Sequence, residues 1–93
     1  MHYLYIIFSK QLNRFYIGES KNPELRLELH NTRHFKANFT KAASDWKLTL
    51  TFECKSKEDD LYLEKFTKKM KSRKFIEKII ENQTILKDIL SKK

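Results

Sequence analysis

Two tyrosines lie on neighbouring segments that both have the composition of β-strands. Tyr5 lies in the sequence YLYII, and Tyr16 follows eleven residues later in FYIG. Because side chains on paired strands are within contact distance, the two phenols can converge on one point. A phenol has a pKa of about 10, so it acts as a base only where nearby positive charge lowers that value. The pair is a candidate for acid–base chemistry, although most tyrosines in strands serve only packing.

A guanidinium and an imidazole lie four residues apart in the segment LRLELHN. On a helix this spacing places Arg26 and His30 on one face. Both side chains can hold a phosphate group, and a neutral histidine can accept a proton near neutral pH. The alternative is a surface arginine beside an exposed or helix-capping histidine.

One carboxylate, Glu64, stands before a run of basic residues. Lys68 lies four residues further on, where it can form a salt bridge worth roughly 0.3–0.5 kcal/mol. Alternatively, the carboxylate is a hard oxygen ligand for Mg²⁺, which often binds through one or two carboxylates and the phosphate oxygens of a substrate. Taken alone, this part of the sequence favours the salt bridge.

The chain is strongly basic, and its positive charge is concentrated in one segment. Twenty Lys and Arg residues against twelve Asp and Glu residues give a net charge of +8, and residues 65–74 hold six positive residues and no acid. A charge distribution of this kind suits a polyanion. We therefore expect nucleic acid as the partner, ahead of an anionic membrane surface, while a solvated helix face is the ordinary explanation of such a run.

The strands that must position these side chains are predicted from the apolar pattern. Residues 2–10 and 14–18 are aromatic and β-branched without helical spacing, which indicates an antiparallel hairpin. The hairpin is predicted to end at Gly18, the only glycine in the chain, because glycine adopts a positive φ at low cost. Residues 47–54 alternate polar and apolar, which predicts a strand with an inward row of four side chains, Leu48, Leu50, Phe52 and Cys54.

The first helix is predicted from its cap and its apolar residues. Asn22-Pro23-Glu24 is a helix start, with a capping side chain, a proline at the first position and an early acid. Leu25 and Leu29 form one face of this helix, which is expected to extend to about His34. Residues 35–46 show no clean period and are predicted as a loop.

Three further amphipathic stretches follow the last strand. A capping box at Ser56 and Asp59 begins the first of them. The apolar positions are Tyr62, Leu63, Phe66 and Met70, then Phe75, Ile76, Ile79 and Ile80, and finally Ile85, Leu86, Ile89 and Leu90. The order β-β-α-β-α-α, closed by a short helix within residues 82–93, describes an α+β fold in which helices pack on a three-stranded antiparallel sheet.

The length of 93 residues leaves room for one domain, expected to span residues 1–93. The longest apolar run, Tyr3–Phe8, is far shorter than the ~20 residues of a membrane span, and the sequence carries no signal-peptide pattern. A single cysteine, Cys54, excludes an internal disulfide and a zinc site with several cysteines, and its place in the alternating strand predicts a small buried residue rather than a nucleophile. We expect a cytoplasmic protein without membrane association.

Taken in order and with their spacing, these segments resemble the GIY-YIG nuclease domain family. The segments that carry the resemblance are Tyr3-Leu4-Tyr5, Tyr16-Ile17-Gly18, the Arg26–His30 segment, Phe39-Thr40-Lys41, Trp46-Lys47-Leu48 and Glu64 six residues before MKSRK. The likeness covers residues 3 to about 80 and is greatest to small single-domain bacterial members, which are similar to the nuclease module of the excision-repair endonuclease subunit. A lone tyrosine motif is weak support, whereas six segments in order are strong support.

Three positions depart from the family pattern. Tyr3 stands at the glycine place of the first motif, a common substitution in the small members. Glu19 follows the second motif where a lysine often stands, and this acid either weakens phosphate approach or turns to solvent. Ile76 occupies the place, about twelve residues after the glutamate, where the wider superfamily has an asparagine; Asn82 is out of register and does not take that role.

The resemblance implies a metal-dependent endonuclease that hydrolyses phosphodiester bonds, with DNA favoured over RNA and a role in DNA repair. It implies one Mg²⁺ or Mn²⁺ on Glu64 and an Arg26 guanidinium that stabilises phosphate charge in the transition state. The general base is Tyr5, Tyr16 or His30, and the sequence does not decide among them. The alternative is a catalytically inactive nucleic-acid-binding domain of the same fold.

The basic side chains are expected to neutralise phosphates that flank the cleaved bond. These are Lys36 and Lys41 in the loop, and Lys65, Lys68, Lys69, Lys71, Arg73 and Lys74 in the basic run. Phe35, Phe39 or Trp46 either stacks on an unpaired base or fills the core. A monomer or weak oligomer is expected.

Overall fold

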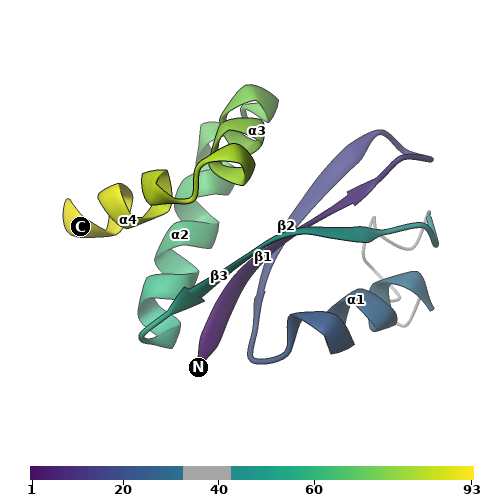
Figure 1. Ribbon diagram of the computed structural model, residues 1–93, viewed down its shortest axis with the longest axis horizontal. Helices are drawn as coiled ribbons and strands as arrows, with labels where there is room; N and C mark the ends of the chain where they lie inside the picture. Colours follow the sequence, from purple (N-terminus) through teal and green to yellow (C-terminus); the bar gives the residue numbers. More distant parts are fainter. Residues whose placement is uncertain (33–42) are drawn as a thin grey trace.

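A computed structural model describes residues 1–32 and 43–93, and it has one three-stranded antiparallel sheet with helices on both faces (Figure 1). The strand order is β2-β1-β3, so that β1 is central. The elements in chain order are β1 (His2–Ser9), β2 (Arg14–Ser20), α1 (Pro23–Asn31), β3 (Lys47–Cys54), α2 (Lys57–Met70), α3 (Arg73–Glu81) and α4 (Thr84–Ser91). The predicted α+β class and antiparallel sheet are confirmed, and α4 is the short helix expected within residues 82–93.

The two faces of the sheet carry separate apolar clusters. The cluster beneath α2, α3 and α4 contains Leu4, Ile6, Ile17, Leu50, Phe52, Cys54, Leu63, Ile79 and Leu86. The cluster on the α1 face contains Tyr5, Ile7, Ala43 and Trp46, with Leu12, Tyr16, Leu27 and Leu48 packed against it. Because β1 is central and its side chains alternate, it supplies the middle of both clusters.

A β-bulge in β3 divides the four side chains that were predicted to point inward between the two faces of the sheet. Ile6 pairs with Leu50, whereas the next residue, Ile7, pairs with Leu48, so Thr49 is an extra residue. Its hydroxyl donates a hydrogen bond to the Ile6 carbonyl at 2.8 Å. The predicted common face of Leu48 and Leu50 is therefore wrong, because the extra residue turns Leu48 to the α1 face.

The turn between β1 and β2 also differs from the prediction. The left-handed residue is Asn13, with a φ of 53°, and no glycine in the described residues has a positive φ. β2 continues beyond Gly18 to Ser20. The predicted reason for a glycine at position 18 is therefore wrong, because a positive φ is not needed there. A side chain at this position would instead collide with the Tyr5 ring.

Helix α1 begins as predicted but buries a different side. The Asn22 side chain accepts a hydrogen bond from the Leu25 amide, and Pro23 stands at the first helical position. The buried residues of α1 are Pro23 and His30, while Leu25 is 50% exposed, so the predicted leucine face is wrong for Leu25. The helix ends at Asn31 rather than near His34, which lies outside the described residues.

Asn31 joins the end of α1 to the start of β3. Its side-chain amide donates to the Trp46 carbonyl at 3.0 Å, and its side-chain oxygen accepts from the Trp46 amide at 2.7 Å. Trp46 is only 2% exposed and fills the core on this face. Of its two predicted alternatives, base stacking and core packing, Trp46 takes core packing; Phe35 and Phe39 lie outside the described residues.

Helix α2 is capped by Ser56, whose hydroxyl accepts from the Asp59 amide at 3.2 Å. The carboxylate of Asp59 instead binds Lys93 at 2.8 Å. The buried positions of α2 are Asp60, Leu63 and Thr67, while Met70 is 47% exposed. The predicted apolar face of this helix is therefore wrong for Met70. Two of the three buried residues are polar, so a hydrophobic pattern does not identify them.

Candidate active site

Three rings from β1, β2 and α1 gather on the α1 face of the sheet. The Tyr5 hydroxyl and the Nε2 atom of His30 are hydrogen-bonded at 3.0 Å, and both residues are buried, at 3% and 1% exposed. The Tyr16 ring centroid lies 4.9 Å from that of His30 and 6.5 Å from that of Tyr5. The structure thus brings together two phenols and an imidazole from residues far apart in the sequence. It excludes the exposed histidine that was the ordinary alternative.

Gly18 leaves the space in which the Tyr5 ring lies. The two residues face each other in the β1–β2 register. A Cβ atom at Gly18 would lie 2.6 Å from both Cζ and Oη of Tyr5 and 2.9 Å from Cε1. Any side chain at this position would therefore displace the Tyr5 phenol from the position in which it binds His30, which gives the glycine a direct part in building the site.

Burial and neighbouring charge set the protonation of the ring cluster. Burial, followed by the Tyr16 phenol and the Glu64 carboxylate, raises the pKa of Tyr5, although Arg26 acts in the opposite direction. Burial and then the Arg26 charge lower the pKa of His30 to about 4. Near neutral pH, Tyr5 therefore keeps its proton and His30 is uncharged.

Arg26 lies one turn before His30 on α1, as predicted, and is half-buried. Its positive charge acts on both the Tyr5 phenol and the His30 imidazole, which places the guanidinium within electrostatic range of the ring cluster. An arginine in this position can neutralise a phosphate that approaches the rings.

Glu64 joins the site from α2, on the opposite layer of the fold. Its Oε1 atom accepts a hydrogen bond from the Lys68 ammonium at 2.7 Å, so the predicted salt bridge is present. The Lys68 nitrogen also lies 5.6 Å from the Tyr16 ring centroid. Because the Glu64 charge contributes to the raised pKa of Tyr5, the carboxylate is within electrostatic range of that phenol.

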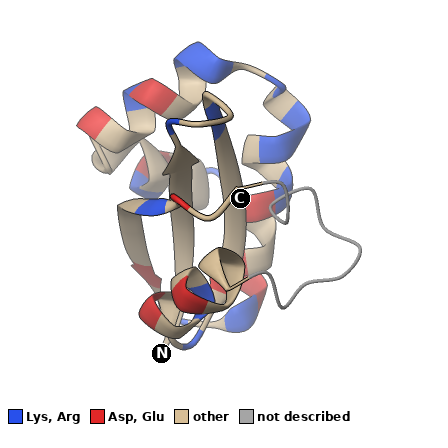
Figure 2. Ribbon diagram, turned by 90° about the vertical axis from the view of Figure 1, so that its right-hand side faces the viewer, with Lys and Arg blue, Asp and Glu red and all other residues tan. Residues whose placement is uncertain are grey.

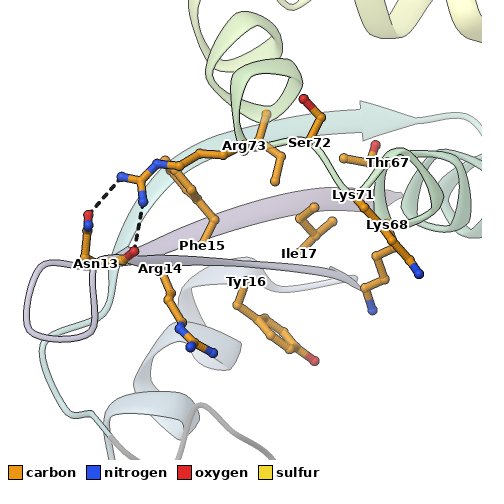
Figure 3. A pocket seen from close by; sticks show the side chains of 11 residues that line it. Asn13, Arg14, Phe15, Tyr16, Ile17, Thr67, Lys68, Lys71, Ser72 and Arg73 are labelled. Carbon is orange, nitrogen blue, oxygen red and sulfur yellow. Dashed lines mark hydrogen bonds between the residues drawn. The ribbon is translucent and has the colours of Figure 1, made fainter.

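An open hollow of about 470 Å³ lies between β2 and the junction of α2 with α3. In Figure 3, Phe15 and Ile17 point from β2 toward the helices, whereas Arg14 and Tyr16 point to the other side. The hollow therefore wraps around the outer edge of β2. A second hollow, of about 580 Å³, is lined by residues of α2 that include Glu64. Lys68 lines both hollows, so they meet at the Glu64–Lys68 pair.

The basic run spans two helices and the turn between them. Lys65, Lys68 and Lys69 are on α2, Lys71 adopts a left-handed conformation with a φ of 48°, and Arg73 and Lys74 begin α3; all six are exposed. Figure 2 shows Lys and Arg along α2 and at its junction with α3, with acidic residues toward the other end of α2. Lys36 and Lys41 lie outside the described residues.

Arg73 has a structural role that the sequence did not indicate. Its guanidinium donates to the carbonyl and side-chain oxygens of Asn13, each at 2.9 Å. It also lies over the rings of Phe8 and Phe15, at 5.8 and 5.3 Å from their centroids. These contacts join the start of α3 to the hairpin turn, and Figure 3 shows the two hydrogen bonds.

Two of the three departures from the family pattern are explained by their positions. Glu19 is partly exposed and faces His2 and the buried Asp60, on the side of the sheet opposite the ring cluster. Ile76 packs against the apolar cluster beneath the helices. Sequence reasoning missed Asp60, because an acid in the first turn of a helix is ordinarily a solvated residue that favours the helix dipole.

Comparison with known proteins identifies the class of this chain. The family model of the GIY-YIG catalytic domain matches residues 1–78 of the 93. The chain therefore belongs to the GIY-YIG family, a nuclease-type family whose members typically are endonucleases and are generally metal-dependent. No curated protein and no solved structure matches it. Within the described residues, no helix is long and apolar enough to cross a membrane.

Proposed function

We propose that this GIY-YIG domain is a metal-dependent endonuclease that hydrolyses phosphodiester bonds, with DNA as the favoured substrate. The observation that carries the proposal is the buried Tyr5–His30 hydrogen bond with Tyr16 beside it, within electrostatic range of both Arg26 and Glu64. Burying the polar groups of a phenol and an imidazole costs stability, and such groups with shifted pKa values are common at functional sites. The sequence resemblance alone supports a role in DNA repair in the cytoplasm.

The donor set at Glu64 fits a magnesium or manganese ion that is completed by substrate. Glu64 is the carboxylate that we assign to the ion, and the three-ligand group found among the described residues does not include it. Mg²⁺ commonly binds through one or two carboxylates, with water and phosphate oxygens as its other ligands. When bound, the ion supplies positive charge that stabilises the phosphate in the transition state.

Among the three candidate bases, exposure favours Tyr16, since Tyr5 and His30 are buried. Tyr5 keeps its proton because burial raises its pKa, and its hydroxyl is engaged with His30. The Nε2 atom of His30 is engaged in the same bond. Tyr16 is partly exposed at the edge hollow, and the Lys68 ammonium lies near its ring. We assign proton transfer to Tyr16, phosphate binding to Arg26, and the positioning of Tyr16 to the Tyr5–His30 pair.

The remaining lysines of the basic run support nucleic-acid binding at the two hollows. Lys65, Lys68 and Lys69 line the hollow beside Glu64, and Lys71 lines the hollow at β2. Contacts with phosphates provide affinity without reading the base sequence. This arrangement suits a strand that crosses the edge of β2 and passes over the Glu64–Lys68 pair.

The test is cleavage of labelled DNA with Mg²⁺ or Mn²⁺, on single-stranded, duplex and branched substrates. Glu64→Gln and Tyr16→Phe are each expected to lower the cleavage rate at least a hundredfold, because each removes one chemical group with little change in shape. Glu58→Gln, an exposed acid on α2, and Tyr62→Phe are the matched controls and keep the parent rate. Cleavage that survives both site substitutions would contradict the assignment.

A catalytically inactive nucleic-acid-binding domain is the second candidate, because the Lys68 ammonium already neutralises Glu64. This candidate predicts binding without cleavage at any metal concentration. Lys68→Met separates the two. In an active nuclease it frees the carboxylate and lowers the metal concentration needed for half-maximal cleavage, whereas in an inactive domain it only weakens binding.

A further inference from the structure

Three potential metal ligands from β1, β2 and α2 meet on the sheet face opposite the ring cluster. They are His2 at the start of β1, Glu19 near the end of β2 and Asp60 in the first turn of α2. One ligand atom from each lies within 4.8 Å of the other two, and the Nδ1 atom of His2 is 3.9 Å from an oxygen of Glu19. The group does not include Glu64, which lies one helical turn further along α2 and pairs with Lys68.

The polar atoms of this group lack the partners that burial ordinarily demands. Asp60 is 0% exposed, and neither of its carboxylate oxygens has a hydrogen-bond partner among the described residues. The Nδ1 atom of His2 is likewise buried without a hydrogen-bond partner there. An ionised carboxylate buried without compensation is costly, and a second carboxylate beside it adds repulsion. Consistent with this, burial and then Glu19 raise the pKa of Asp60.

The geometry points to a Zn²⁺ site formed by one nitrogen of His2 and one oxygen each of Glu19 and Asp60. Three protein ligands of this kind with one open position match the usual coordination of Zn²⁺. Bond lengths of about 2.0–2.2 Å separate neighbouring ligands of a tetrahedral ion by about 3.4 Å. The observed separations exceed this value by about 1.4 Å or less, which small side-chain rotations can close.

The donor atoms of this group favour Zn²⁺ over the Mg²⁺ proposed at Glu64. Two carboxylates and a neutral imidazole give the site two negative charges, which one divalent cation neutralises. Imidazole is a preferred ligand of zinc, whereas Mg²⁺ prefers oxygen ligands and retains its water. Bound here, the ion ties both strands of the hairpin to the first turn of α2. The inference rests on these three side chains and stands without nuclease activity.

Untagged, chelator-treated protein tests the site with Zn²⁺ alone. Competition against a coloured chelator is expected to give one Zn²⁺ per chain, and thermal unfolding is expected to shift upward when Zn²⁺ is added. Asp60→Asn and Glu19→Gln should each weaken Zn²⁺ binding at least tenfold and abolish that shift. Asp60→Asn should also melt higher than the parent without metal, because it removes the buried charge. Mg²⁺ at equal concentration should produce no shift.

Two controls make the result specific to this site. Glu64→Gln keeps the parent affinity for Zn²⁺, and so does Asp59→Asn, which changes a neighbouring acid on the same turn. The inference is overturned if Glu19→Gln and Asp60→Asn bind Zn²⁺ within threefold of the parent, or if only Glu64→Gln loses it. Glu19 is partly exposed, so Glu19→Gln alone decides the outcome if Asp60→Asn does not fold.

Discussion

Gly18→Ala is the most direct test of how the site is built. The added methyl group would lie 2.6 Å from Cζ and Oη of Tyr5. Carbon atoms in contact prefer about 3.5–4.0 Å, so the ring has to move by about 1 Å. The hydrogen bond to His30, now at 3.0 Å, cannot survive a movement of that size away from the imidazole.

The expected cost follows from three contributions. Overpacking a buried position costs about 1–3 kcal/mol, and the lost hydrogen bond adds about 1 kcal/mol. Replacing a glycine of ordinary φ by alanine stabilises the folded protein by about 0.4–1 kcal/mol, because the unfolded chain then has less conformational entropy to lose. We therefore expect Gly18→Ala to destabilise the protein by about 1–3 kcal/mol, at about 4–8 °C of melting temperature per kcal/mol.

A double-mutant cycle measured by urea unfolding separates the clash from any backbone effect. In a Tyr5→Leu background the atoms that the methyl group meets are gone, so Gly18→Ala should become neutral or stabilising. The coupling between the two substitutions is then at least about 1 kcal/mol, as residues in direct contact give. If Gly18→Ala alone melts at or above the parent temperature, the spatial explanation of this glycine is refuted.

Three further outcomes follow from the charges and contacts of the site. The pKa of His30 is about 4 in the folded protein, against the ordinary value of 6.5 in the unfolded chain. The folded protein therefore binds fewer protons between these two values, and its stability falls as the pH drops through that window. Asp60 takes up a proton on folding and has the opposite effect, so the test uses Asp60→Asn protein. In this variant the free energy of unfolding should fall by up to about 3 kcal/mol as the pH is lowered through the window. The double variant Asp60→Asn, His30→Gln should show no such fall. Arg73→Lys should lower the free energy of unfolding by about 1 kcal/mol through the lost bonds to Asn13, whereas Lys74→Ala should leave urea unfolding unchanged. In a filter-binding assay at several salt concentrations, Lys74→Ala should instead reduce the salt dependence of DNA binding by about one phosphate contact.

Much of the fold follows from short-range patterns in the sequence. The alternation in residues 47–54 predicts β3 with its observed bounds, because each inward side chain meets an apolar cluster. Asn22 and Ser56 begin α1 and α2 because their side chains satisfy amides that the helix leaves without partners. The shared helix face of Arg26 and His30 likewise follows from their four-residue spacing and helix geometry alone.

Other features depend on contacts that no local pattern encodes. The bulge at Thr49 leaves the alternation of β3 intact in the sequence while it reverses the face of Leu48. Asp60 and Thr67 occupy inward positions of α2, although a hydrophobic pattern assigns such residues to the surface. Gly18 is fixed by a ring thirteen residues earlier, so its constraint is visible only once β1 and β2 are in register.

The bulge also bears on how molecules of this protein meet one another. β3 is an outer strand of the sheet, and a straight outer strand offers an unbroken row of amides and carbonyls to the strands of other chains. The extra residue at Thr49 interrupts that row in mid-strand, and the exposed charges of Lys47 and Glu53 flank the interruption. A concentrated solution of the folded protein is thereby protected from edge-to-edge aggregation along this strand.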